Sequence, residues 1–269
     1  MGFEQLLSVT TIQVLLLAAL IGAVLEIDNY FVGMTIVSQP VIAGIITGAV
    51  IGDVKTGLLI GAVVQLLWIN TPPVGAFVPP SATAITITAA VFSVIGMKVM
   101  NIPPGNSFIM FSITIGAGIG YFVGQMDIWN RKLNTGIIHK FEKKVKSGKG
   151  NYIILIQIFA VFSKIIRDFV LYSALFFLGI VLAAEIFMSM PIQIHNAFGL
   201  AFWMLPAVGF AVVFDMFKTG AGIKLYAVVF LFSYILFSIQ NVNIYFFALA
   251  LAVIALIVIY NSIWNRKEA

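Results

Sequence analysis

Residues 39–69 read QPVIAGIITGAVIGDVKTGLLIGAVVQLLWI, two strongly apolar runs on either side of a short polar break. The second run, 58–69, is too short to cross a bilayer unaided, because a transmembrane helix needs roughly 20 apolar residues. The break carries Asp53, Lys55 and Thr56. These residues form either a tight turn with a local ion pair or a secondary ligand site.

The second run leads into NTPPVGAFVPPS at 70–81, which contains four prolines. Proline removes a backbone donor and stops helices, and non-helical backbone at membrane depth is tolerated only inside protein or beside a water-filled cavity. The pattern therefore predicts a re-entrant hairpin over 58–81. An ordinary turn outside the membrane is the alternative.

The composition of the whole chain indicates a membrane protein. Of 269 residues, 61% are hydrophobic and only 9% are charged, and the mean hydropathy is +1.10. Soluble domains carry about a quarter of their residues as charged side chains. The chain is therefore expected to be an integral membrane protein.

The apolar runs predict an all-α, polytopic membrane protein with about eight to nine membrane segments. Residues 151–168 carry three charged side chains and are expected to form a helix at the membrane interface or packed inside the protein. The other apolar runs are 10–25, 41–51, 82–100, 108–123, 169–189, 197–214, 223–239 and 244–263.

Charge divides the chain into a membrane half (1–130), a basic loop (131–150) and a second membrane half (151–269). Cytoplasmic loops concentrate lysine and arginine, so the loop is expected in the cytoplasm, as a solvated anchor or as a contact for a partner. Arg266 and Lys267 place the C-terminus on the same side. The basic residues of the loop are Arg131, Lys132, Lys140, Lys143, Lys144, Lys146 and Lys149.

Neutral polar side chains gather around the proline-rich break. Gln65, Asn70 and Ser81 could bind the hydroxyls of an uncharged polyol such as a sugar, and Trp68 could pack against its ring. A single glutamine in a span more often bonds a neighbouring helix. Asp28 is a fourth candidate ligand, because intramembrane carboxylates are costly and therefore functional candidates.

The second half repeats the polar break of the first. Asp215, Lys218 and the following Thr-Gly lie after an apolar run, with one more residue between Asp and Lys than at Asp53 and Lys55. Transporters are often built from inverted repeats with the substrate held between them. The repeat favours transport over membrane-bound enzymology.

No motif for independent chemistry or cofactor binding occurs in the sequence. Cysteine is absent, and the two histidines, His139 and His195, lie far apart, so no metal site and no cofactor are expected. Phosphate-binding, dinucleotide-binding and nucleophile-elbow motifs are also absent. Glycines at 116, 118, 120 and 124 are expected to allow close helix packing. The energy for transport must then come from an ion gradient or a partner protein.

The motifs at 39–44, 48–57, 61–66, 74–76 and 79–80 together resemble the membrane component IIC of the mannose/fructose/sorbose family of the bacterial phosphoenolpyruvate-dependent sugar phosphotransferase system. The most specific element is Gly-Asp-x-Lys-Thr-Gly at 52–57, followed at fixed spacing by Gln65. Some family members carry arginine at the position of Gln39, and many carry glutamate at that of Gln65 and an acidic or amide residue at that of Ser81. The sugar therefore stays open.

The resemblance implies a sugar-translocating subunit in the bacterial cytoplasmic (inner) membrane. It implies a membrane partner, IID, and cytoplasmic IIA and IIB proteins that carry the phosphoryl group, so that no catalytic residue is expected in this chain. The sugar would move by alternating access and be phosphorylated by IIB. An ion-gradient-driven secondary sugar transporter, coupled through Glu26, Asp28 or Asp215, is the alternative.

Overall fold

A computed structural model describes residues 6–30, 35–71, 78–146 and 151–216. The chain divides into two compact units, Met1–Val212 and Val213–Ala269. Only 213–216 of the second unit are described, so the fold below is that of the first. The spans expected over 223–239 and 244–263 lie outside the described residues, as do Lys218, Arg266 and Lys267.

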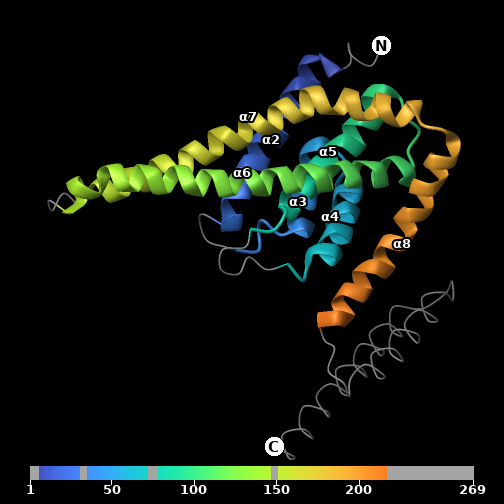
Figure 1. Cartoon of the computed structure of the whole chain (residues 1–269). Coiled ribbons are helices and arrows are strands. Elements are labelled where there is room, and N and C mark those ends of the chain that lie inside the picture. The colour runs from blue at the N-terminus through green and yellow to red at the C-terminus, as the bar shows by residue number, and fades with distance from the viewer. Residues whose placement is uncertain (1–5, 31–34, 72–77, 147–150, 217–269) are drawn as a thin grey trace, which may run out of the picture. The chain divides into compact units, whose positions relative to one another are not determined.

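Every secondary-structure element within the described residues is a helix (Figure 1). The helices in chain order are α2 (Val9–Tyr30), α3 (Pro40–Ile51), α4 (Val54–Trp68), α5 (Ala82–Met100), α6 (Asn106–Lys146), α7 (Asn151–Ser189) and α8 (Ile192–Met216).

Five of these helices are long and apolar enough to cross a membrane: α2, α5, α6, α7 and α8. Hydrocarbon offers no partner for backbone amides and carbonyls, so an apolar chain satisfies them within helices. The all-helical polytopic class is confirmed. The number of eight to nine segments stays a prediction.

Helix α5 forms the centre of the first unit and is buried along most of its length. Helices α2, α3, α4, α6 and α7 all pack against it. Its sequence, ATAITITAAVFSVIGMKVM, is rich in alanine, threonine and other small residues, which let neighbouring backbones approach closely. Of the glycines of α6 expected to allow close packing, Gly116 and Gly120 lie against Ile85 and Gly124 lies against Pro79, whereas Gly118 has no atom within 4 Å of its Cβ position and takes no part in the packing.

Helices α3 and α4 form a tight antiparallel hairpin joined at Gly52 and Asp53. Gly52 has a φ of +78°, a left-handed conformation that glycine adopts without a steric penalty, and ends α3. Asp53 caps α4, since its carboxylate accepts hydrogen bonds from Thr56 N (3.0 Å) and Oγ1 (2.7 Å). The polar break was interpreted as a tight turn or as a secondary ligand site, and this helix cap is the contact expected of a turn. Lys55, the other charged residue of the break, is exposed.

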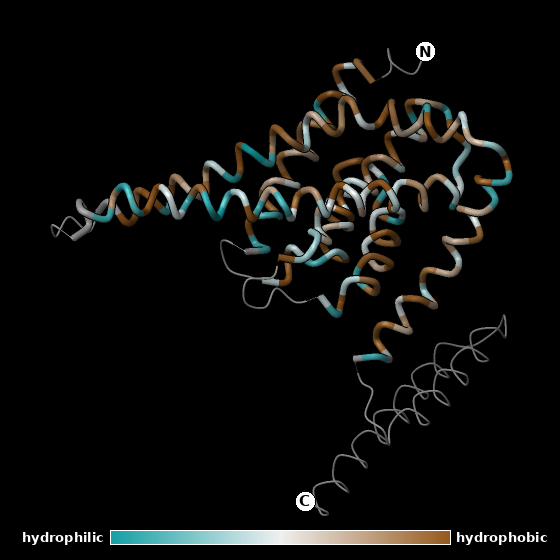
Figure 2. The backbone as a smooth tube through the Cα atoms, viewed as in Figure 1, coloured by the Kyte–Doolittle hydropathy of each residue, from teal (hydrophilic) through white to brown (hydrophobic). Residues whose placement is uncertain are grey.

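Residues 131–146, expected in a loop, continue α6 as a helix through Lys146. The reason is that lysine, arginine and glutamate are good helix formers and no proline interrupts the segment. Figure 2 shows hydrophilic residues along this part of α6. Residues 151–168 are the first half of α7. Lys164 and Asp168 are buried, whereas Ile154 and Phe159 are exposed, so only the end of this segment is packed inside the protein.

Candidate functional site

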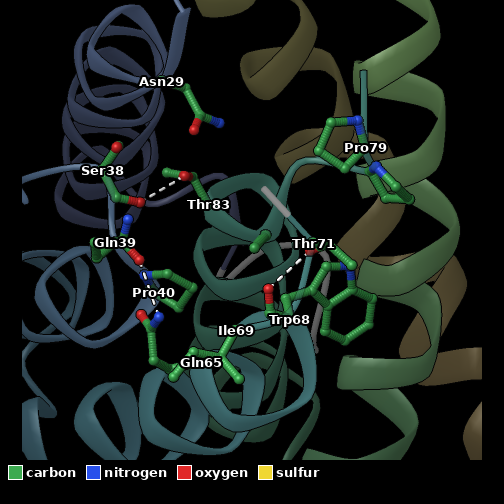
Figure 3. A pocket seen from close by; sticks show the side chains of 12 residues that line it. Asn29, Ser38, Gln39, Pro40, Gln65, Trp68, Ile69, Thr71, Pro79 and Thr83 are labelled. Atoms are coloured by element: carbon green, nitrogen blue, oxygen red, sulfur yellow. Dashed lines mark hydrogen bonds between the residues drawn. The ribbon is translucent and has the colours of Figure 1, made fainter. Parts of the chain in front are cut away.

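A cavity of about 350 Å³ lies where the ends of four helices meet (Figure 3). The end of α2, the start of α3, the end of α4 and the segment that leads into α5 supply its walls. Six of the side chains that line it are polar, and Trp68 adds an indole. The lining residues are Asn29, Ser38, Gln39, Pro40, Gln65, Trp68, Ile69, Thr71, Pro79, Pro80, Ala82 and Thr83.

The helices end at the cavity for reasons that lie in the sequence. Pro40 occupies the first turn of α3, where its missing N–H costs nothing. Pro79 and Pro80 keep the chain out of a helix until Ser81, whose hydroxyl accepts the N–H of Ala84 (3.0 Å) and caps α5.

Two glutamine amides form the most specific feature of the cavity. Gln65 Nε2 donates to Gln39 Oε1 at 2.9 Å, which links α4 to the start of α3 (Figure 3). Gln65 Oε1 is buried and has no hydrogen-bond partner within the described residues. An unsatisfied buried acceptor costs about 1–3 kcal/mol. The site therefore offers an acceptor for a hydroxyl donor.

Other polar contacts support the wall. Thr83 Oγ1 donates to the Ser38 carbonyl at 2.6 Å and joins the start of α5 to the residues before α3. Thr71 Oγ1 donates to the Trp68 carbonyl at 2.7 Å beyond the end of α4. Trp68 is half-buried, so the indole has room for an apolar contact with a ligand.

The four expected ligands are not brought together. Gln65 lines the cavity, whereas Asn70, Ser81 and Asp28 are not among its lining residues. Asn70 is exposed. Asp28 holds the segment that follows α2, because its carboxylate accepts from Thr35 N (2.8 Å), Thr35 Oγ1 (2.7 Å) and Ser38 N (3.0 Å).

Sequence reasoning selected Gln65 but none of the other five polar side chains that line the cavity, which are Asn29, Ser38, Gln39, Thr71 and Thr83. Gln39 directly precedes Pro40, which starts α3, and a polar residue at the start of a helix could have indicated a place in the site. Asp215, expected at a turn or secondary site, is exposed near the end of α8. Within the described residues, no group of three side chains suited to a metal ion is found.

A second polar cluster is buried among α2, α6 and α7. Lys164 Nζ lies 2.8 Å from Asp127 Oδ1 and 2.9 Å from Asp168 Oδ2. Arg167 Nη2 lies 2.6 Å from Oδ1 of each of these two aspartates. Glu26 is also fully buried, and its Oε1 accepts from Ser81 Oγ (2.5 Å) and Tyr172 OH (3.2 Å). We call these seven residues the charge cluster.

Comparison with known families decides what kind of protein carries this cavity. Residues 11–258 match the family described as the sorbose-specific IIC component of the phosphotransferase system (PTS). The chain belongs to this family. It is the IIC component of a mannose-family PTS sugar transporter, as the motifs at 39–80 led us to expect.

Curated relatives agree with this assignment. The mannose-specific EIIC component of Escherichia coli K12 is 25% identical over 228 residues, which cover 80% of this IIC chain and 77% of that protein. N-acetylgalactosamine permease IIC component 1 of the same organism is 37% identical over 73 residues, 27% of each chain. The named sugars differ between these relatives.

Solved structures share the fold. A structure described only as that of a membrane protein matches with a TM-score of 0.67 at 20% identity and covers 94% of this chain and 96% of the other. The mannose transporter ManYZ in complex with microcin E492 matches with a TM-score of 0.53 at 20% identity and covers 96% of both chains. At this identity the likeness concerns the fold alone.

Proposed function

We propose that this IIC component binds an uncharged sugar in the cavity between α2, α3, α4 and α5 and moves it across the bacterial cytoplasmic membrane. The observation that carries the proposal is the buried, unsatisfied Oε1 of Gln65 in a polar cavity. Ligand sites combine a few well-placed polar groups with apolar surface. Here the amides of Gln39 and Gln65 would bind sugar hydroxyls, and Trp68 would cover one face of the ring.

Of the other expected ligands, Ser81 and Asp28 have contacts that favour positioning roles. Ser81 already caps α5 and donates to Glu26. Asp28 holds Ser38, which lines the cavity. We infer that both act on the sugar through the walls they position, while Asn70 remains a proposed ligand at the end of α4.

The α3–α4 hairpin supports a re-entrant arrangement, earlier in the chain than the 58–81 segment expected from the prolines. Its helices have 12 and 15 residues. At 1.5 Å per residue they are about 18 and 22 Å long, shorter than the roughly 30 Å hydrocarbon core of a bilayer. We infer that the hairpin enters the membrane and turns back at Gly52 and Asp53, with the cavity at its open end.

Partners complete the transport cycle. We propose that IID forms the pathway together with this chain, and that IIA and IIB relay the phosphoryl group to the sugar on the cytoplasmic side. A phosphorylated sugar is trapped, because a charged group crosses an apolar barrier at high cost. In an alternating-access cycle, the cavity at the open end of the hairpin would first open to the outside of the cell and then to the cytoplasm.

The proposed orientation places the basic end of α6 and the C-terminus in the cytoplasm, by the positive-inside rule. Neutralising Lys143, Lys144 and Lys146 together by glutamine is expected to slow sugar phosphorylation by IIB several-fold at low salt, because charge steers association. The rate is measured on membranes with added IIB. If the rates at low salt are unchanged and the topology is preserved, the basic end of α6 does not contact IIB.

Transport itself is tested by deleting the gene and measuring uptake of hexoses, amino sugars and ketoses. Uptake of at least one sugar should be lost and should depend on phosphoenolpyruvate in the parent strain. Uptake that is abolished by a protonophore, with phosphoenolpyruvate still present, would instead support the ion-gradient-driven alternative.

Gln65→Ala is expected to weaken the apparent affinity for the sugar about tenfold, as expected for the loss of one or two hydrogen bonds to a polar ligand. The measurement is the sugar concentration at half-maximal uptake. Gln193→Ala is the matched control, because Gln193 is exposed at the start of α8. If Gln65→Ala and Gln193→Ala transport with the same affinity, Gln65 does not bind the sugar.

A further inference from the structure

The charge cluster lies directly behind the wall of the cavity. Glu26 precedes Asn29 by one helical turn on α2, and Asn29 lines the cavity. Ser81, which donates to Glu26, is followed at once by Ala82 and Thr83, which also line it. The Glu26–Ser81 hydrogen bond therefore ties the end of α2 to the start of α5 at the site.

The cluster contains more acidic groups than basic ones. Three carboxyl groups, those of Glu26, Asp127 and Asp168, face two cations, and all three carboxyl residues are fully buried. Of the cations, Lys164 is fully buried and Arg167 is only 14% exposed. Complete ionisation would leave one negative charge without a counterion. An uncompensated buried charge is strongly unfavourable, so such groups bind a proton instead.

The contacts indicate which carboxyl group holds that proton. Asp127 and Asp168 each touch both Lys164 and Arg167, which stabilise their ionised forms. Glu26 instead accepts hydrogen bonds from two neutral hydroxyls, those of Ser81 and Tyr172. Its second oxygen, Oε2, is buried and makes no hydrogen bond within the described part of the chain, as is also the case for Asp127 Oδ2 and Asp168 Oδ2. The neutral partners of Glu26 are therefore what distinguishes it from the two aspartates.

The charged groups that face Glu26 come from two helices. Asp127 faces it from α6, and Lys164 and Asp168 face it from α7. Tyr172 of α7 and Ser81 at the start of α5 add only hydroxyls. The two aspartates repel a negative charge on Glu26, whereas Lys164 attracts it. Because Lys164 and Arg167 also pair with both aspartates, the two cations cannot balance three ionised carboxyl groups.

We propose that Glu26 is a proton-binding site: Oε2 carries the single proton that balances the charge cluster, and the neutral carboxyl holds α2 to the start of α5. When this proton is lost at alkaline pH, Glu26 carries a negative charge behind the cavity wall, and Asp127 and Asp168 repel that charge. Sugar uptake should then decline at alkaline pH. This last step rests on the proposed function, whereas the proton site does not.

The proton is observed by infrared difference spectroscopy between neutral and alkaline pH, on the full chain in lipid bilayers within its membrane assembly. The parent protein should show a carbonyl band of a protonated carboxylic acid at neutral pH that is lost at alkaline pH. Glu26→Gln should lack this band. Glu185→Gln, a matched change at an exposed glutamate of α7, should keep it.

Asp127→Asn tests the charge balance with Glu26 intact. Two cations then face two carboxyl groups, so Glu26 ionises and the band should be lost at neutral pH. This variant also decides the question if Glu26→Gln does not fold. A band that persists in either Glu26→Gln or Asp127→Asn, or its absence from the parent protein, overturns the proton site.

Uptake is measured over the same pH range. Glu26→Gln keeps a neutral side chain at all pH values, so its uptake should lose the alkaline decline of the parent. A lost band with an unchanged pH profile overturns the link between Glu26 and the cavity. If the parent transports no sugar at any pH, the proposed function fails, and the band still decides the proton site.

Discussion

Gly57→Ala is expected to abolish sugar uptake and to destabilise the chain by about 1–3 kcal/mol or more, the usual cost of overpacking. A Cβ on Gly57 would overlap the Gly44 carbonyl oxygen and approach Gly48 Cα to 2.9 Å. These atoms belong to the backbone, so no side chain can rotate away to make room. The two helices would have to separate, and α4 carries Gln65 and Trp68 into the cavity.

The measurements are uptake in cells and the thermal unfolding midpoint of the purified protein. Gly118→Ala is the matched control in another helix, because a Cβ there meets no atom within 4 Å. This control should transport normally and unfold at the same or a slightly higher temperature, since alanine favours helices over glycine. Normal transport by Gly57→Ala would show that the α3–α4 packing does not limit the site.

Lys164→Met is expected to cost about 3–5 kcal/mol of stability, because it leaves buried carboxylates with one cation instead of two. Lys164 is fully buried between Asp127 and Asp168, at 2.8 and 2.9 Å. Combining Lys164→Met with Asp168→Leu removes one charge of each sign and should recover most of the loss. Denaturant or thermal unfolding, followed by tryptophan fluorescence, measures both variants.

Lys132→Met is the control for the loss of one lysine, because Lys132 is exposed on α6. Its free energy of unfolding should change by no more than about 0.5 kcal/mol, the usual range for surface substitutions. If Lys164→Met is as stable as Lys132→Met, the charge cluster does not stabilise this membrane fold. A double variant less stable than Lys164→Met alone would contradict the balance of charges on which the cluster depends.

Part of the site was predictable from sequence because its polar residues interrupt apolar runs. Gln65 stands out in α4 and lines the cavity, and Trp68 lies one turn later. Ser81 and Asp28 stand out in the same way, yet they serve as a helix cap and as an anchor for the segment after α2. Polarity alone does not distinguish a ligand from a group that holds the backbone.

The sequence by itself determined the membrane environment, the helical class and the family. These follow from hydropathy, from the need of backbone groups for internal partners in lipid, and from local motifs. The tertiary structure alone decided which polar groups meet. Gln39 pairs with Gln65 across 26 positions, and Glu26 reaches Ser81 across 55 and Tyr172 across 146. Such contacts depend on which helices pack together, and hydropathy records only that each helix is apolar.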